Sequence, residues 1–105
     1  MQKLINNTLL NADAYLKNFG FSEEQIAPLL VQAEKDLVNE LEKIQRLLSE
    51  ETIDNVALNR ALHALKGLLF HLGNHELAEK LAELREEDDV SSDIRGISEL
   101  LFNEG

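Results

Sequence analysis

Apolar residues recur every three or four positions along most of the chain, which is the period of an amphipathic helix. The longest such run covers residues 22–49, and its apolar seam steps through Ile26, Leu30, Ala33, Leu37, Leu41, Ile44 and Leu48. Ser22 and Gln25 have the spacing of a capping box at its start. We therefore predict one long helix over residues 22–49.

The same period predicts four further helices, over residues 2–18, 54–72, 75–87 and 92–102. Gly20 separates the first two helices, and Gly73 is placed to end the third as a C-cap glycine. No segment shows the alternating pattern of a β-strand. Because short connections between amphipathic helices favour antiparallel neighbours, the predicted fold is all-α. We expect an antiparallel four-helix bundle with an additional N-terminal helix, in a single domain over residues 1–105.

The charge balance narrows the kinds of partner. The chain has 20 acidic and 10 basic side chains, which gives a formal net charge of −10. Such a charge repels nucleic-acid phosphates and anionic lipid headgroups, so we expect neither nucleic acid nor membrane as a partner. Cysteine is absent, which excludes disulfides and thiol chemistry and suits a reducing compartment. No apolar run has the length of a membrane span or a signal peptide, so we predict a cytoplasmic protein.

The predicted helix over residues 54–72 has two distinct faces. Its core face is predicted to hold Leu58, Ala61, Leu65, Leu69 and Leu72, flanked by Leu62 and Leu68. Offsets of three, four and seven residues place a second set on the opposite stripe: Val56, Asn59, Arg60, His63, Lys66, Gly67, Phe70 and Asn74. The pattern therefore predicts an exposed histidine at the middle of this helix.

The neighbours of His63 favour a nucleophilic role. Arg60 and Lys66 are cations three residues to either side, and no carboxylate lies three or four residues away, so the neutral imidazole is favoured. Lys66 is placed to pair with the oxygens of a phosphoryl group on that ring. Gly67 costs about 1 kcal/mol of helix propensity relative to alanine, and it leaves space for a close approach.

The motif His63-x-Leu65-Lys66-Gly67, followed by Leu72-Gly73, resembles the signature of histidine-containing phosphotransfer domains, the intermediates of two-component phosphorelays. The resemblance extends to the predicted order of helices. It implies that His63 accepts a phosphoryl group from an aspartyl phosphate on the receiver domain of a response regulator and relays it to another receiver aspartate. It also implies that Lys66 steadies the phosphoryl group and that Gly67 gives steric access.

The same resemblance implies a phosphoprotein of signal transduction with no catalytic activity of its own. It implies no cofactor in this chain, because the magnesium would be supplied by the receiver domain. The partners would be a receiver domain and a histidine kinase or hybrid kinase, and the carrier itself would be a monomer.

The sequence departs from the family pattern after Gly67. Most relatives have small residues there, whereas this chain has Leu68, Leu69, Phe70 and His71. A bulky ring on the exposed stripe must either dock against the partner or obstruct it. We hypothesise that Phe70 and Val56 are apolar anchors for the receiver domain. The predicted partner-binding residues are Val56, Asn59, Arg60, Phe70 and Asn74.

Two other functions remain open at this point. His63 is also compatible with the phosphoacceptor domain of a histidine kinase, labelled by an ATP-binding domain. That role commonly needs a carboxylate hydrogen-bonded to the histidine, for which Glu79, Glu83 or Glu86 are candidates. The second alternative is a helical adaptor that works without phosphorylation, and the retention of both His63 and Lys66 argues against it.

No metal site is predicted. His71 and His75 have a spacing that can hold a metal, but the helix is predicted to end between them and no third ligand is evident. The acidic run over residues 86–89 lacks the alternating ligand spacing of a calcium loop, and we interpret it as a solvated connection.

Overall fold

The chain is all-helical. The computed structural model describes residues 2–85 and 94–102, in which no strand occurs. Its five helices are α1 (Gln2–Asn18), α2 (Glu23–Leu48), α3 (Asn55–His71), α4 (His75–Arg85) and α5 (Ile94–Phe102). These bounds confirm the five predicted helices to within one residue wherever the predicted ends fall on described residues. The predicted ends at residues 87 and 92 and the acidic run over residues 86–89 lie outside the described residues.

Side-chain caps fix where the two central helices begin. Ser22 Oγ accepts a hydrogen bond from the Gln25 backbone N–H (3.3 Å), and Gln25 Oε1 accepts one from the Ser22 N–H (2.9 Å). The predicted capping box is therefore confirmed. At α3 the carboxylate of Asp54 accepts from the N–H groups of Val56 and Ala57, both at 3.1 Å. This cap fixes the residue at which α3 begins.

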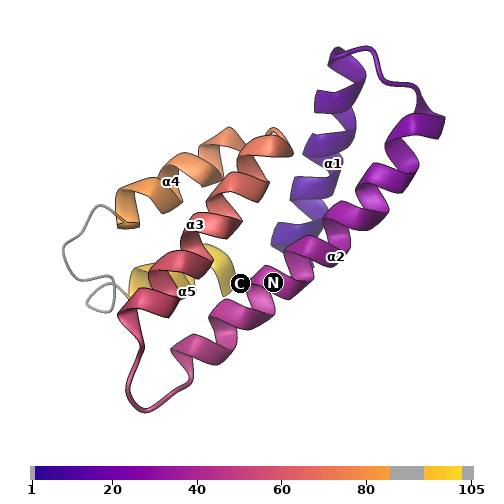
Figure 1. Cartoon of the computed structure of the whole chain (residues 1–105). Coiled ribbons are helices and arrows are strands. Elements are labelled where there is room, and N and C mark those ends of the chain that lie inside the picture. Colours follow the sequence, from indigo (N-terminus) through magenta and orange to yellow (C-terminus); the bar gives the residue numbers. More distant parts are fainter. Residues whose placement is uncertain (1, 86–93, 103–105) are drawn as a thin grey trace.

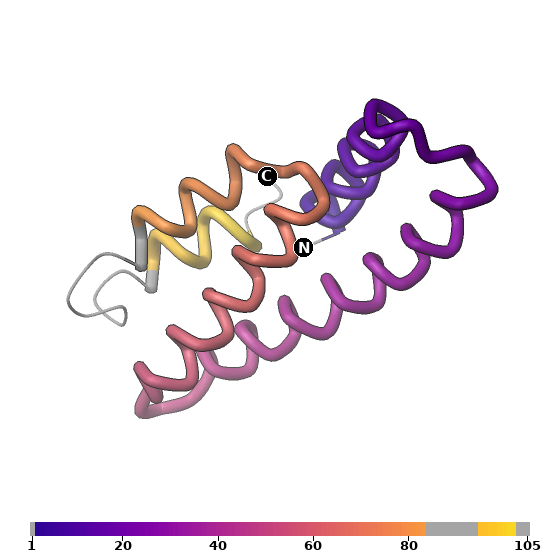
Figure 2. The backbone as a smooth tube through the Cα atoms, turned by 45° about the horizontal axis from the view of Figure 1, so that its top comes forward, coloured from indigo at the N-terminus to yellow at the C-terminus, as the bar shows by residue number. Residues whose placement is uncertain are grey.

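The longest helix, α2, is the element along which the others are arranged (Figure 1). α1 runs antiparallel to its N-terminal half, and α3 runs antiparallel to its C-terminal half (Figure 2). α4 then turns back along α3, and α5 returns beside them. The chain measures 45 × 26 × 22 Å along its principal axes, and its long dimension follows α2.

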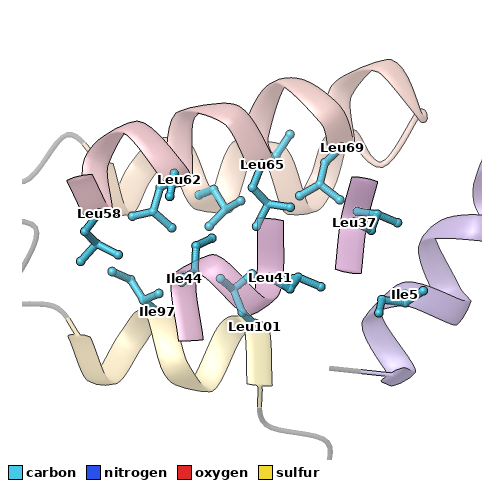
Figure 3. Packing of buried hydrophobic residues seen from close by; sticks show 13 residues of the cluster. Ile5, Leu37, Leu41, Ile44, Leu58, Leu62, Leu65, Leu69, Ile97 and Leu101 are labelled. Atoms are coloured by element: carbon cyan, nitrogen blue, oxygen red, sulfur yellow. The ribbon is translucent and has the colours of Figure 1, made fainter. Parts of the chain in front are cut away.

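All five helices contribute to one hydrophobic core. Figure 3 shows leucines of α3 facing side chains of α2 and α5. The fully buried large side chains are Ile5, Ile26, Leu37, Leu41, Ile44, Leu58, Leu62, Leu65, Leu69, Leu81, Ile97 and Leu101. The predicted core face of α3 is thereby confirmed, except that Leu62 is fully buried and Leu72 is only half-buried. Since α3 turns its leucines inward, its opposite stripe is left to solvent.

Among the described residues, no helix combines the length and the apolar character that crossing a membrane requires.

Candidate functional site

His63 is exposed at the middle of α3, on the side opposite the core. Its neighbours Ala61, Leu62 and Leu65 are buried, which holds the helix in place beneath the imidazole. Asn59, Arg60, His63 and Ala64 line an open hollow on this surface. Within the described part of the chain, no carboxylate pairs with His63. The ring is thus presented on the solvent side of α3, and neither of its nitrogens bonds to a described residue.

The electrostatic character of α3 differs from that of the rest of the protein. α3 contains no Asp or Glu, although the chain has 20 of them, and each of the other four helices carries at least one. Arg60 is exposed and Lys66 is half-buried, one on each side of His63. Side chains three residues apart on a helix have Cβ atoms about 5–6 Å apart. An anion that approaches His63 therefore meets two cations and no carboxylate of the same helix.

Gly67 is not needed by the fold. A Cβ added at this position would contact nothing within 4 Å, because the residue faces open space. Its helical conformation is one that alanine adopts more readily than glycine. Gly73 is different, since its φ is +80° and an added Cβ would collide with the ring of Tyr15. The structure thus explains Gly73 and gives no internal reason for Gly67.

The two predicted anchors, Val56 and Phe70, are exposed as expected, with 62% and 55% of their surface accessible. The Phe70 ring is nevertheless supported from one side. It stacks on His75 with ring centroids 4.5 Å apart, and His75 in turn meets the edge of Tyr15 at 5.6 Å. Tyr15 continues the row to Phe19 at 4.9 Å. This row is not predictable from the sequence pattern, because it depends on how the turn between α3 and α4 packs against α1.

Asn74 is another of the predicted partner-binding residues. It lies beyond the end of α3, and it is half-buried. Its Nδ2 donates to Thr8 Oγ1 at 3.0 Å, and its Oδ1 accepts from the Leu77 N–H at 3.4 Å. Asn74 therefore joins α1 to the start of α4. Thr8, the buried polar residue that receives this bond, was not singled out by the sequence pattern.

The remaining candidate residues differ in how far they are exposed. Asn59 is half-buried beside Arg60 in the hollow next to His63. Glu79 and Glu83, the carboxylates considered for a kinase-type role, are exposed on α4, and Glu86 lies outside the described residues. His71 and His75 are both exposed, and His75 takes part in the aromatic row. Over residues 2–85 and 94–102, no group of three or more His, Cys, Asp or Glu side chains is arranged to hold a metal ion.

A scan against protein-family models, a search of curated proteins and a search of solved structures each found no match. A functional proposal for this chain therefore depends on its own residues and on their geometry.

Proposed function

We propose that this chain is a histidine phosphotransfer protein, in which His63 carries a phosphoryl group between the aspartates of receiver domains. The helices α2 to α5 would form the four-helix bundle of such a carrier, with α1 as the additional helix, in a cytoplasmic signalling pathway. The observation that carries the proposal is an exposed histidine on the one described helix without a carboxylate, next to Lys66 and to Gly67, a glycine that the fold does not require.

The proposed transfer is a single displacement at phosphorus. The unprotonated nitrogen of His63 attacks the phosphorus of the aspartyl phosphate. A P–N bond forms as the bond between phosphorus and the carboxylate oxygen breaks, and the receiver keeps a free carboxylate. Arg60 and Lys66 offset the charge on the phosphoryl oxygens. The reverse displacement, by a second receiver aspartate, regenerates the imidazole. Magnesium would belong to the receiver domain.

Few special residues are needed for this reaction, because holding two reactive groups in line supplies much of the rate enhancement. On this chain, the packing of α3 against the core holds His63 in position. Four leucines of this helix, Leu58, Leu62, Leu65 and Leu69, have no exposed surface and lock its rotation relative to α2. The exposed stripe can therefore meet a receiver domain without prior rearrangement of α3.

The deciding experiment mixes the protein with magnesium-loaded, phosphorylated receiver domains and characterises the adduct. We expect a phosphate that is stable in base and labile in acid, located on His63 by mass spectrometry. Labelling by an ATP-binding kinase domain but by no receiver would favour the kinase phosphoacceptor function. No labelling from a broad panel of receivers and kinase domains would overturn the proposal in favour of an adaptor.

Gly67→Ala is expected to raise the free energy of unfolding and to lower the rate of phosphoryl transfer. The fold should gain up to about 1 kcal/mol, because alanine is the better helix former and meets no neighbour. Transfer should become slower, since the added methyl group stands where the receiver approaches. Urea unfolding and transfer rates on the same samples check both effects. Gly67→Leu extends the series, and a transfer rate that does not fall with side-chain size would contradict the role of Gly67.

Phe70→Ala is expected to weaken binding of the unphosphorylated receiver domain about tenfold, since the ring is a supported, exposed apolar anchor. Isothermal titration calorimetry measures the affinity. Phe19→Ala is the matched control, because Phe19 is 66% exposed and ends the same aromatic row on the side of α1. Equal affinities for the wild type and Phe70→Ala would show that Phe70 is not an anchor.

A further inference from the structure

Exposed apolar side chains gather on the hairpin formed by α1 and the N-terminal part of α2, residues 2–33. The exposed fractions there are 73% for Leu10, 66% for Phe19, 40% for Phe21, 46% for Leu29 and 56% for Val31. The helices α3 to α5 lie toward the other end of α2 (Figure 1), and they meet α1 on one side, where Tyr15 contacts His75 and Thr8 bonds to Asn74. Two helices alone cannot cover each other on all sides, and the uncovered side needs a further layer.

One face of the hairpin is an apolar groove. Leu9 and Leu10 of α1 and Leu30 of α2 line it together with Asn6 and Asp13, and its volume is about 630 Å³. Leu10 exposes nearly three quarters of its surface beside this groove. An apolar groove with an exposed leucine beside it, on a charged protein, is typical of an interaction surface.

The distribution of charge indicates which partner fits this groove. Residues 2–33 contain Lys3 and Lys17 against Asp13, Glu23 and Glu24, which is a net charge of −1 out of −10 for the chain. The remaining −9 lies on other residues. Two copies of this acidic protein therefore repel one another only weakly when they meet at the hairpin.

The two helices of the hairpin also differ in the sign of their net charge. α1 has two lysines against one aspartate, a net charge of +1, whereas the part of α2 within the hairpin has two glutamates and no basic side chain, a net charge of −2. In a two-fold symmetric dimer, α1 of each copy can lie over α2 of the other copy. The favourable contact between opposite net charges then occurs twice.

We propose that the hairpin face is a homodimer interface, in which the grooves of two copies close on each other to form a layer of four helices. This differs from the monomer that the family resemblance implies. The proposal does not depend on the function assigned to His63. α3 packs along the C-terminal half of α2, at the other end of that helix, so both copies of His63 would remain accessible (Figure 1).

Sedimentation of the full chain over a range of concentrations tests the proposal. We expect the wild type to form a dimer. Leu10→Glu should raise the dimer dissociation constant about a hundredfold or more, because each of the two copies loses a buried leucine side chain. Leu10→Lys should raise it less, since the new cation faces the acidic α2 of the other copy. Circular dichroism should show an unchanged fold for both, because Leu10 is exposed.

Val56→Glu and Val56→Lys are the matched controls. Val56 is similarly exposed, at 62%, but lies at the start of α3, and the two changes alter the net charge as the Leu10 changes do. The Val56 pair should leave the dissociation constant nearly unchanged. A wild-type protein that stays monomeric up to about 1 mM would overturn the proposal, as would a groove filled only by a helix of another protein. Equal changes of the dissociation constant in the Leu10 variants and in the Val56 variants would also overturn the proposal. The change of net charge alone would then explain the result.

Discussion

His63→Gln is expected to abolish phosphoryl transfer while leaving the fold unchanged. The imidazole is exposed and makes no hydrogen bond or ion pair with the described residues, so its removal costs the folded state no contact of that kind. Glutamine is also a comparably good helix former. Its amide, however, has no nucleophilic ring nitrogen to form a P–N bond. The transfer assay should therefore show no labelled protein, and thermal unfolding should show a transition close to that of the wild type.

His71→Gln is the control that makes this result specific. His71 is also exposed and also belongs to α3, but it lies at the C-terminal end of the helix, beyond the stripe of Arg60, His63 and Lys66. We expect this variant to accept phosphate at the wild-type rate. Label that persists in His63→Gln, or that disappears in His71→Gln, would assign the phosphoacceptor to another residue and contradict the proposed site.

The exposure of His63 was predictable because both faces of α3 follow from one local rule. A helix repeats every 3.6 residues, and Leu58, Leu65 and Leu69 all fall on one side of that repeat. Once those leucines are buried, the position of His63 is determined without knowledge of any other helix. The start of α2 was predictable for the same reason, since its capping box involves residues only three positions apart.

The surroundings of α3 were not predictable, because they depend on a contact between distant parts of the chain. The bond from Asn74 to Thr8 joins residues 66 positions apart, and it removes Asn74 from the exposed stripe. The same packing of α1 against the turn after α3 brings Tyr15 beside His75 and thereby supports Phe70. Helical periodicity reports which face of α1 is apolar, but not against which turn that face is placed.

Gly73→Ala is expected to cause the largest loss of stability among the variants considered, and it tests this long-range packing. Gly73 has a φ of +80°, at the turn where its N–H donates to the Phe70 carbonyl (3.1 Å) and the Asn74 N–H donates to the Leu69 carbonyl (2.9 Å). An L-residue in the left-handed region costs about 1–2 kcal/mol. The added Cβ would also lie 2.7 Å from Cδ2 and 2.8 Å from Cδ1 of Tyr15. Overpacking of this kind typically adds about 1–3 kcal/mol.

Gly20→Ala separates the two costs, because Gly20 has a φ of +93° and an added Cβ there would meet nothing within 4 Å. Urea unfolding should therefore show a loss of about 1–2 kcal/mol for Gly20→Ala and about 2–5 kcal/mol for Gly73→Ala. In a Tyr15→Ala background the ring is gone, and Gly73→Ala should then cost no more than Gly20→Ala does. This cycle measures the contact between α1 and the turn directly. Equal losses for the two glycine variants in the wild-type background would show that Tyr15 moves aside freely, and that α1 is not held against the turn by this contact.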